Sequence, residues 1–420
     1  MIEHSGEPPA AAAMPYFEFV AMVALLMALN AMAVDVILPA LQQMGASLSV
    51  SAENQRQLPI TAYIALFGVS QLVYGPLSDH FGRRRVLFFG LALYALASLG
   101  AAFAGSFAML LTMRAIQGIG AGATRVIAIS VVRDTFDGRK MASVMSLVMM
   151  VFMAVPIVAP TLGQGILMLA GWRAILILVA VSGLVMAVWC FLRLPETLAE
   201  RNRRPLQVGR ILEAFRIVLT NRVAFGYAIS TALVFGCLFA FLNSAQQIYQ
   251  EVYGLGALFP IVFSSGAIFI AAASFTNSRI VERLGMRLLA HGALAGFACV
   301  SALLSTIALF DDGQIPFAAF YALTTVALCL FGFIGTNFNA LAMDPLGHVA
   351  GTASSVLGFL QTFVGGLIGA VIGLTYDRTV LPLALGFLSL SAASFVILVF
   401  TERGRLFGAS PVAGESSPAD

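Results

Sequence analysis

Long apolar runs occupy most of this sequence, and each is about as long as the ~20 residues that a helix needs to cross a bilayer. The chain has 420 residues, of which 60% are hydrophobic and only 10% are charged. The runs are continuously apolar, whereas the strands of a membrane barrel alternate over roughly ten residues. We therefore expect an all-α integral membrane protein with twelve spans. The expected spans are residues 16–38, 57–77, 86–104, 107–132, 142–168, 172–193, 223–247, 257–277, 286–309, 315–342, 349–376 and 380–402.

The cationic residues indicate how these spans are oriented. If both termini are cytoplasmic, all but five of the 23 Lys and Arg residues fall in inner loops or tails. Only Arg56, Arg173 and Arg378 then face outward, and Arg114 and Arg125 lie within spans. This distribution follows the positive-inside rule. The net charge of +3 therefore needs no nucleic-acid partner to explain it.

A polar interruption at Leu194–Arg210 divides the spans six and six. We predict an N-terminal bundle at residues 1–193, a cytoplasmic linker at 194–222, a C-terminal bundle at 223–402 and a disordered cytoplasmic tail at 403–420. The halves also resemble each other. SRIVERLGMRL in the second half matches GPLSDHFGRRR in the first, with Glu282 at the place of Asp79 and Gly285 at that of Gly82. Parallel repeats of six helices are typical of transporters, whose substrate site lies near the membrane midplane between the repeats.

The stretch GPLSDHFGRRR concentrates charge between two apolar spans. A topology anchor needs only cationic residues, so its glycines and its acid require another explanation. The pattern resembles the signature of the loop between the second and third helices of the major facilitator superfamily. The resemblance implies the major facilitator fold, with two six-helix bundles, and a cytoplasmic gate at this loop. The gate residues would be Gly75, Asp79, Gly82, Arg83, Arg133 and Asp134.

Two further motifs narrow the resemblance. LLTMRAIQGIGAGA in span 107–132 is similar to the superfamily motif that places an arginine in the N-terminal bundle. VPIVAPTLGQG in span 142–168 resembles the antiporter motif of drug exporters, through Pro156, Pro160 and Gly163, and departs from it at Ala159 and Gln164. With AVDVILPALQQM and DPLGHVAGTASSVLGF, these motifs resemble the bicyclomycin-resistance (Bcr/CflA) type of drug:proton antiporter.

The prolines and glycines of the antiporter motif have direct structural consequences. Each proline removes a helical hydrogen bond and can bend the helix. Gly163 and Gly165, like the glycines of GIGAGA, are expected to allow close helix approach. A bent, closely packed helix can act as a hinge and seal the path against proton leak; bending without any antiport role is the alternative.

Asp35 is the only acidic residue deep inside a predicted span. A charge at the bilayer centre costs about 2.5–3.5 kcal/mol on insertion scales, so such residues face a cavity or a partner. A site that alternately exposes and pairs a carboxylate can take up and release a proton. This favours a proton-coupling role for Asp35. The alternative is a local hydrogen bond near the helix end before Pro39.

Arg114 is the natural counterion of Asp35, because arginine stays protonated and a buried cation must be paired or solvated. The resemblance implies that Arg114 couples protonation to substrate release; otherwise it snorkels to the interface. Arg125 lies eleven residues further along and on roughly the same helix face, where the resembling transporters have a small residue. It is consistent with an anionic substrate, with a second partner for Asp35, or with snorkelling.

Substrate recognition is expected to be mostly apolar, with a few polar contacts. The resemblance implies a cavity lined by the first, second, fourth and fifth spans of the N-terminal half and by their counterparts in the C-terminal half. The candidate residues are Asn30, Tyr63, Gln71, Arg125, Asn243, Gln246, Phe331, Asn337, Phe338, Asn339, Gln361 and Phe363. Any single aromatic residue among them can equally be a packing residue.

The sequence contains no recognisable catalytic set. Its four histidines are scattered, and no spacing is typical of a zinc or nucleotide site, so we expect no enzyme, no cofactor and no metal. We predict a monomeric, proton-driven exporter of small amphipathic molecules in the bacterial inner membrane, with both termini cytoplasmic. The first alternative is a symporter or facilitator for a metabolite such as an amino acid, a sugar or an organic acid. The second, a receptor or scaffold, has Asp35 and Arg114 against it.

Overall fold

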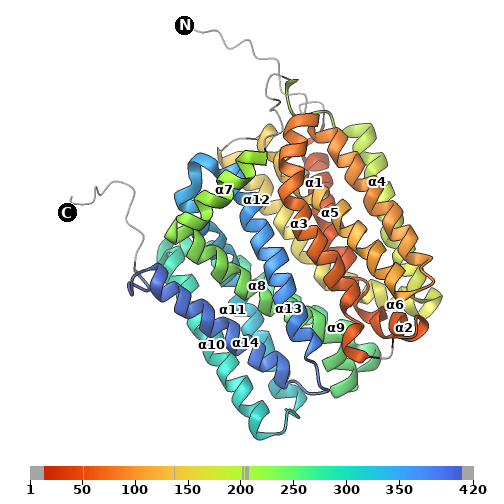
Figure 1. The fold of residues 1–420 in the computed structure, drawn as a ribbon, viewed down its shortest axis with the longest axis vertical. Helices are drawn as coiled ribbons and strands as arrows, with labels where there is room; N and C mark the ends of the chain where they lie inside the picture. Colours follow the sequence, from red (N-terminus) through yellow and green to blue (C-terminus); the bar gives the residue numbers. More distant parts are fainter. Residues whose placement is uncertain (1–13, 51, 137, 201–202, 204–207, 409–420) are drawn as a thin grey trace. The chain divides into compact units, whose positions relative to one another are not determined.

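The structure is a computed structural model, and it describes residues 14–50, 52–136, 138–200, 203 and 208–408. Within these residues all regular structure is helical (Figure 1). The N-terminal part contains α1 (Tyr16–Asp35), α2 (Leu41–Ser47), α3 (Leu58–Phe81), α4 (Arg83–Ala102), α5 (Phe107–Thr135) and α6 (Gly138–Arg193). The C-terminal part contains α7 (Val208–Thr220), α8 (Arg222–Gln247), α9 (Phe259–Leu284), α10 (Met286–Phe310), α11 (Phe317–Met343), α12 (Ala350–Phe359), α13 (Gly365–Leu374) and α14 (Leu381–Thr401).

Eleven helical segments of the described residues are long and apolar enough to cross a membrane. One of them, Ser143–Arg193, has 51 residues, about twice what a bilayer requires. It is interrupted at Gly171, where φ is 77° and ψ is 176°, a conformation that suits glycine because it lacks a Cβ. Divided at this glycine, α6 supplies two spans, as predicted from the gap between residues 168 and 172.

Short irregular helices interrupt or extend several spans. The first span stops being regular after Asp35 and continues as a 3₁₀ turn, η2 (Leu38–Ala40), into α2. A second 3₁₀ turn, η3 (Glu53–Gln55), precedes α3. Two π-helical turns, η5 (Ile248–Val252) and η8 (Leu360–Val364), follow α8 and α12. Turns of this kind occur frequently at functional sites, and η8 contains two of the predicted cavity residues, Gln361 and Phe363.

The predicted linker contains a helix that the sequence reading missed. Helix α7 has the sequence VGRILEAFRIVLT, in which apolar residues recur at helical spacing, so it is amphipathic. Its Val218 is buried, and the ring of Phe215 lies 5.8 Å from that of Phe359. The division into bundles, linker and tail stays a prediction, and residues 201–202, 204–207 and 409–420 lie outside the described residues.

The chain divides into two compact units. Unit 1 comprises residues 1–213 and 243–267, and unit 2 comprises residues 214–242 and 268–420. In unit 1, α5 packs against α1, α3 and α4, and α6 packs against α1 and α4 (Figure 1). Three glycines of α5 make this possible, because an added Cβ would overlap Tyr63 at Gly118, the backbone of Tyr94 at Gly120 and Ser70 at Gly122. The close approach predicted for GIGAGA is confirmed.

Residues 243–267 are held within unit 1 by two polar contacts. Arg56 forms an ion pair with Glu251 at 3.0 Å. Gln247 Nε2 donates a hydrogen bond of 2.7 Å to the carbonyl oxygen of Glu53. The ends of α8 and η5 are thereby joined to the segment between α2 and α3.

Unit 2 contains a polar chain that joins two helices to the turn after a third. The Phe407 N–H donates to His291 Nδ1 at 3.2 Å, so the ring hydrogen lies on Nε2, which donates to the Tyr227 hydroxyl at 2.9 Å. Tyr227 in turn donates to Glu402 at 2.6 Å, and Arg287 pairs with the same carboxylate at 3.1 Å. The chain connects α8 and α10 to the turn after α14.

The two matching loops share one backbone conformation. Gly82, between α3 and α4, has φ 94° and ψ 152°. Gly285, between α9 and α10, has φ 82° and ψ 150°. A side chain is strained at such positive φ, so both loops require glycine at the same place. The repeat predicted from GPLSDHFGRRR and SRIVERLGMRL is therefore present in the backbone as well.

Candidate functional site

Three charged side chains are buried in the described part of the chain, and all three belong to predicted sites. Their exposed fractions are 5% for Asp35, 3% for Arg83 and 0% for Arg114. Buried charges are rarely tolerated without partners. Their partners therefore indicate what each one does.

Arg114 is held by neutral acceptors from three helices. Its guanidinium donates to the carbonyl oxygens of Ala33 on α1 at 3.0 Å and Pro59 on α3 at 3.2 Å, and to Gln117 on its own helix. The guanidinium carbon lies 4.6 Å from the centre of the Tyr63 ring. The Ala33 carbonyl belongs to the last turn of α1, where carbonyls lack helical partners and a cation is favoured. Arg114 is thus fully buried, whereas a snorkelling side chain would keep its charged head in water.

Asp35 is the last residue of α1 and lies two residues beyond the Arg114 acceptor Ala33. Within the described residues Asp35 forms no hydrogen bond or ion pair, and the ion pair with Arg114 that the sequence suggests is not formed in this structure. A carboxylate at a helix C-terminus is also disfavoured by the helix dipole. Asp35 is therefore a buried acid whose charge is not compensated. Its role in proton coupling remains a prediction.

The antiporter motif packs directly on the end of α1. A Cβ at Gly163 would overlap the carbonyl oxygen of Val36, the residue after Asp35. Pro156 and Pro160 keep helical backbone angles, since the break in α6 lies at Gly171. The expectation for Gly165 was wrong, because no atom lies within 4 Å of a Cβ added there. One glycine of the motif, not both, brings α6 against the acid-bearing turn.

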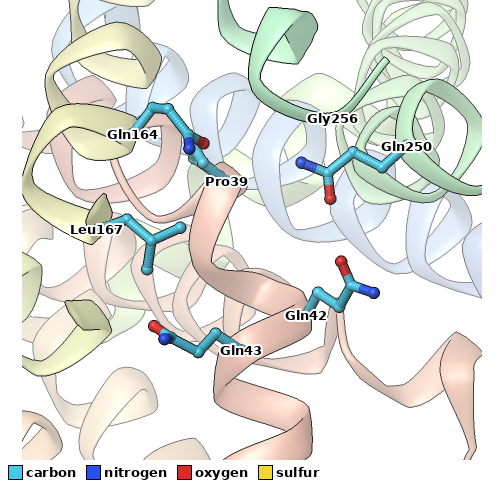
Figure 2. A pocket seen from close by; sticks show the side chains of 7 residues that line it. All are labelled: Pro39, Gln42, Gln43, Gln164, Leu167, Gln250 and Gly256. Atoms are coloured by element: carbon cyan, nitrogen blue, oxygen red, sulfur yellow. The ribbon is translucent and has the colours of Figure 1, made fainter. Parts of the chain in front are cut away.

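A cavity of about 300 Å³ lies beside this contact in unit 1. Figure 2 shows four glutamine side chains around it, together with Pro39, which lies in the 3₁₀ turn η2 that follows α1. One of them, Gln164, is one of the two residues at which the antiporter motif departs from its usual pattern. The Gln43 side chain also accepts the N–H of Trp172 at 3.2 Å, directly after the break in α6. The lining residues are Pro39, Gln42, Gln43, Gln164, Leu167, Gln250 and Gly256.

The predicted gate motif forms a connected network in unit 1. Arg83 pairs with Asp134 at 2.9 Å and with Asp79 on the preceding helix, and it donates to the Ser78 hydroxyl at 2.7 Å. The structure thus brings Asp79, Gly82, Arg83 and Asp134 together. Arg133 is exposed and does not take part in this network.

Glu196 is a member of this network that the sequence reading missed. Its carboxylate accepts the backbone N–H groups of Arg83 at 2.9 Å and Arg84 at 3.1 Å. These are the first residues of α4, so the carboxylate caps the helix N-terminus and complements its dipole. A Cβ at Gly82 would lie 2.5 Å from Glu196 Oε2. The available signal was the Leu-Pro-Glu-Thr run that follows the arginine at the end of α6.

The predicted cavity residues of unit 1 are mostly buried. The Tyr63 hydroxyl donates to Asn30 at 2.8 Å, and Gln71 donates to the Phe67 carbonyl at 3.4 Å. Gln246 donates to Gln250. Asn243 is 1% exposed, and neither its oxygen nor its nitrogen has a partner among the described residues. Such unsatisfied buried amides mark places where water or a ligand would bind.

The predicted cavity residues of unit 2 divide between packing and polar contacts. Phe331 lies against Phe235 at 5.0 Å, and Phe338 lies against Tyr227 at 5.4 Å and is fully buried. Asn337 donates to Asn277 at 2.8 Å. The other members of this group are Asn339, which donates to the Gly335 carbonyl, Gln361, which is buried, and Phe363, which stacks on Phe359.

Comparison with known proteins decides the family. Residues 23–370 match the profile of the Major Facilitator Superfamily. The chain belongs to this superfamily. It is 32% identical over 367 residues to the uncharacterized MFS-type transporter YdgK of Bacillus subtilis, covering 86% of this chain and 89% of the relative. It is 31% identical to a bicyclomycin resistance protein homolog of Haemophilus influenzae, covering 87% and 92%, and 28% identical to multidrug resistance protein D of Escherichia coli, covering 83% and 87%.

Solved structures support the major facilitator fold. A crystal structure of a D-xylose–proton symporter matches with a TM-score of 0.71 at 14% identity, covering 94% of this chain and 99% of that protein. The xylose transporter XylE from E. coli matches with a TM-score of 0.68 at 13% identity, covering 92% and 98%. At this identity the likeness concerns the fold alone. Family and fold make the chain a multi-pass membrane transporter, as the sequence predicted.

Proposed function

We propose that this protein exports small amphipathic molecules across the bacterial inner membrane in exchange for protons. Relatives named for bicyclomycin and multidrug resistance support drug export, and the distribution of arginines supports cytoplasmic termini. The observation that carries the proposal is Asp35, a buried acid without a counterion among the described residues. It lies one residue before the carbonyl that the antiporter-motif glycine contacts.

In the proposed mechanism, protonation of Asp35 and binding of substrate exclude each other. Protonated Asp35 is neutral, and Arg114 then stays on the carbonyl oxygen of Ala33. When Asp35 loses its proton, the carboxylate two residues further along attracts the guanidinium away from that carbonyl, because the charged acceptor forms the stronger hydrogen bond. The end of α1 and the turn packed on Gly163 then change together. Substrate entering from the cytoplasm favours this deprotonated form, and protons entering from outside restore the other.

The proposal is tested in cells that express the chain. Drug susceptibility and retention of a fluorescent amphipathic dye are measured with and without a proton uncoupler. Expression should raise drug tolerance and lower dye retention, and the uncoupler should abolish both effects. Asp35→Asn, at equal membrane abundance, should behave like the empty vector. Increased dye accumulation on expression would instead support uptake, the symporter or facilitator alternative, and contradict export.

A further inference from the structure

Two of the three arginines of α5, Arg114 and Arg125, lie inside the predicted span 107–132, and of these two only Arg114 has acceptors among the described residues. Each nitrogen of the Arg114 guanidinium donates to one of the acceptors described above. Arg125 lies eleven residues further along, about 16 Å along the axis and rotated by about 20°, so both side chains leave the same face of the helix. Within the described residues Arg125 forms no hydrogen bond or ion pair; its recorded contact is the ring of Phe67, 5.9 Å from the guanidinium carbon.

Helix α3 covers this face of α5. The contacts at Gly118 and Gly122 place Tyr63 and then Ser70 and Tyr74 successively along it, so the two helices run in the same direction. Long helical side chains lean towards the N-terminus of their helix, which points Arg125 back towards Phe67 and the Gly122 level. The guanidinium is therefore directed along the face of α5 that packs against α3, the face on which Arg114 is buried.

A second donor without an acceptor lies at the same level. Tyr74 is 3% exposed, and its hydroxyl has no partner among the described residues. Its ring lies 3.3 Å from a Cβ built on Gly122, one helical turn from Arg125. A phenolic O–H on the helix that faces Arg125, together with a planar guanidinium with five N–H groups, is a donor set that suits a carboxylate, which accepts bidentate hydrogen bonds from arginine.

The energetics also favour an anionic ligand. A cation within a span is unfavourable unless it is paired or hydrated. Arg125 is only half-buried, so water can offset part of this cost while the ligand is absent. Asp35 does not supply the missing charge, since it forms no ion pair within the described residues. The cation is thus left available to a bound anion.

We propose that Arg125 and Tyr74 form an anion subsite in the N-terminal bundle, and that this transporter selects substrates with a carboxylate on an otherwise apolar body. The expected export of such substrates rests on the proposed export function. Their binding at the subsite does not depend on the direction or the driving force of transport.

The test uses one apolar dye with a carboxylate and the methyl ester of the same dye. Binding to the purified protein in detergent is measured by fluorescence polarisation, and efflux is measured in cells. Arg125→Gln should weaken binding of the carboxylate dye by roughly tenfold or more, the factor expected for a lost charge-assisted hydrogen bond. Tyr74→Phe should weaken it several-fold, and Arg125→Lys should recover part of the loss. The ester should bind all variants alike, and Arg173→Gln serves as the matched arginine control.

The two proposals fail in different ways. Unchanged binding of the carboxylate dye to Arg125→Gln would overturn the subsite, and so would an equal loss of carboxylate and ester binding in a normally folded variant. The latter would give Arg125 a role in substrate binding that does not depend on the carboxylate. Wild-type protein that binds the carboxylate dye with the predicted variant effects, but does not export it, would contradict the export function and leave the subsite supported.

Discussion

Several single residues in this protein make contacts so close that adding or removing one methyl or carboxylate group would disturb them. The two glycines of the antiporter motif make the clearest comparison. Gly163 touches the Val36 carbonyl, whereas a Cβ at Gly165 would meet nothing within 4 Å. From the sequence, both glycines are expected to allow close helix approach, because spacing along one helix does not reveal which face meets α1.

Gly163→Ala is expected to impair transport while Gly165→Ala leaves it intact. The added methyl group must displace the turn after Asp35, and overpacking of this kind typically costs about 1–3 kcal/mol. Efflux rate and apparent Tm in detergent, compared between the two variants, check this expectation. Equal efflux rates and equal apparent Tm values for the two variants would mean that the contact between α6 and this turn does not matter for transport.

Glu196 is predicted to stabilise the start of α4. Glu196→Ala removes the acceptor of two backbone N–H groups and should lower the free energy of unfolding by about 0.5–2 kcal/mol. Glu200→Ala is the matched control, since the Glu200 side chain is 89% exposed. Thermal unfolding in detergent should give a lower apparent Tm for the first variant only. A wild-type Tm for Glu196→Ala would show that water replaces the carboxylate as a cap without cost.

At the scale of elements, the sequence predicted the spans well because their signal is local. Length and hydropathy are enough to locate a helix such as α10, expected at 286–309 and observed as Met286–Phe310. Helix α7 was not predicted, because it is short and amphipathic and its charged residues are typical of a polar linker. The Glu196 cap was beyond reach for another reason: the bond to Arg83 spans 113 residues, so only the tertiary fold brings the two together.

The polar chain of unit 2 provides a prediction at this scale. Tyr227→Phe removes the hydroxyl between His291 and Glu402 and should destabilise the packing of α8, α10 and the turn after α14. A buried group left without its partner costs about 1–3 kcal/mol. Thr306→Val is the control, because Thr306 is exposed and bonds only within its own helix. The apparent Tm should fall for Tyr227→Phe alone; an equal fall in both variants would contradict a specific role of the chain.

For the whole molecule, motif resemblance predicted the family, and the match between the two halves of the sequence predicted the repeat, which the shared conformation of Gly82 and Gly285 supports. The pairing of Asp35 with Arg114 could not be read from sequence, because it depends on how α1 and α5 are rotated against each other. The structure instead gives Arg114 neutral acceptors and leaves Asp35 without a counterion among the described residues. We therefore propose that one acid, Asp35, gains and loses a proton during transport.

The most direct measurement uses purified protein in liposomes that contain an internal pH indicator. An imposed gradient of transported dye should drive protons in the opposite direction through wild-type protein. Asp35→Asn should still bind the dye and move no protons, because its amide does not titrate. Glu18→Gln, which alters an acid of the same helix that is paired with Arg193, should keep proton movement. Full proton movement through Asp35→Asn would contradict the account.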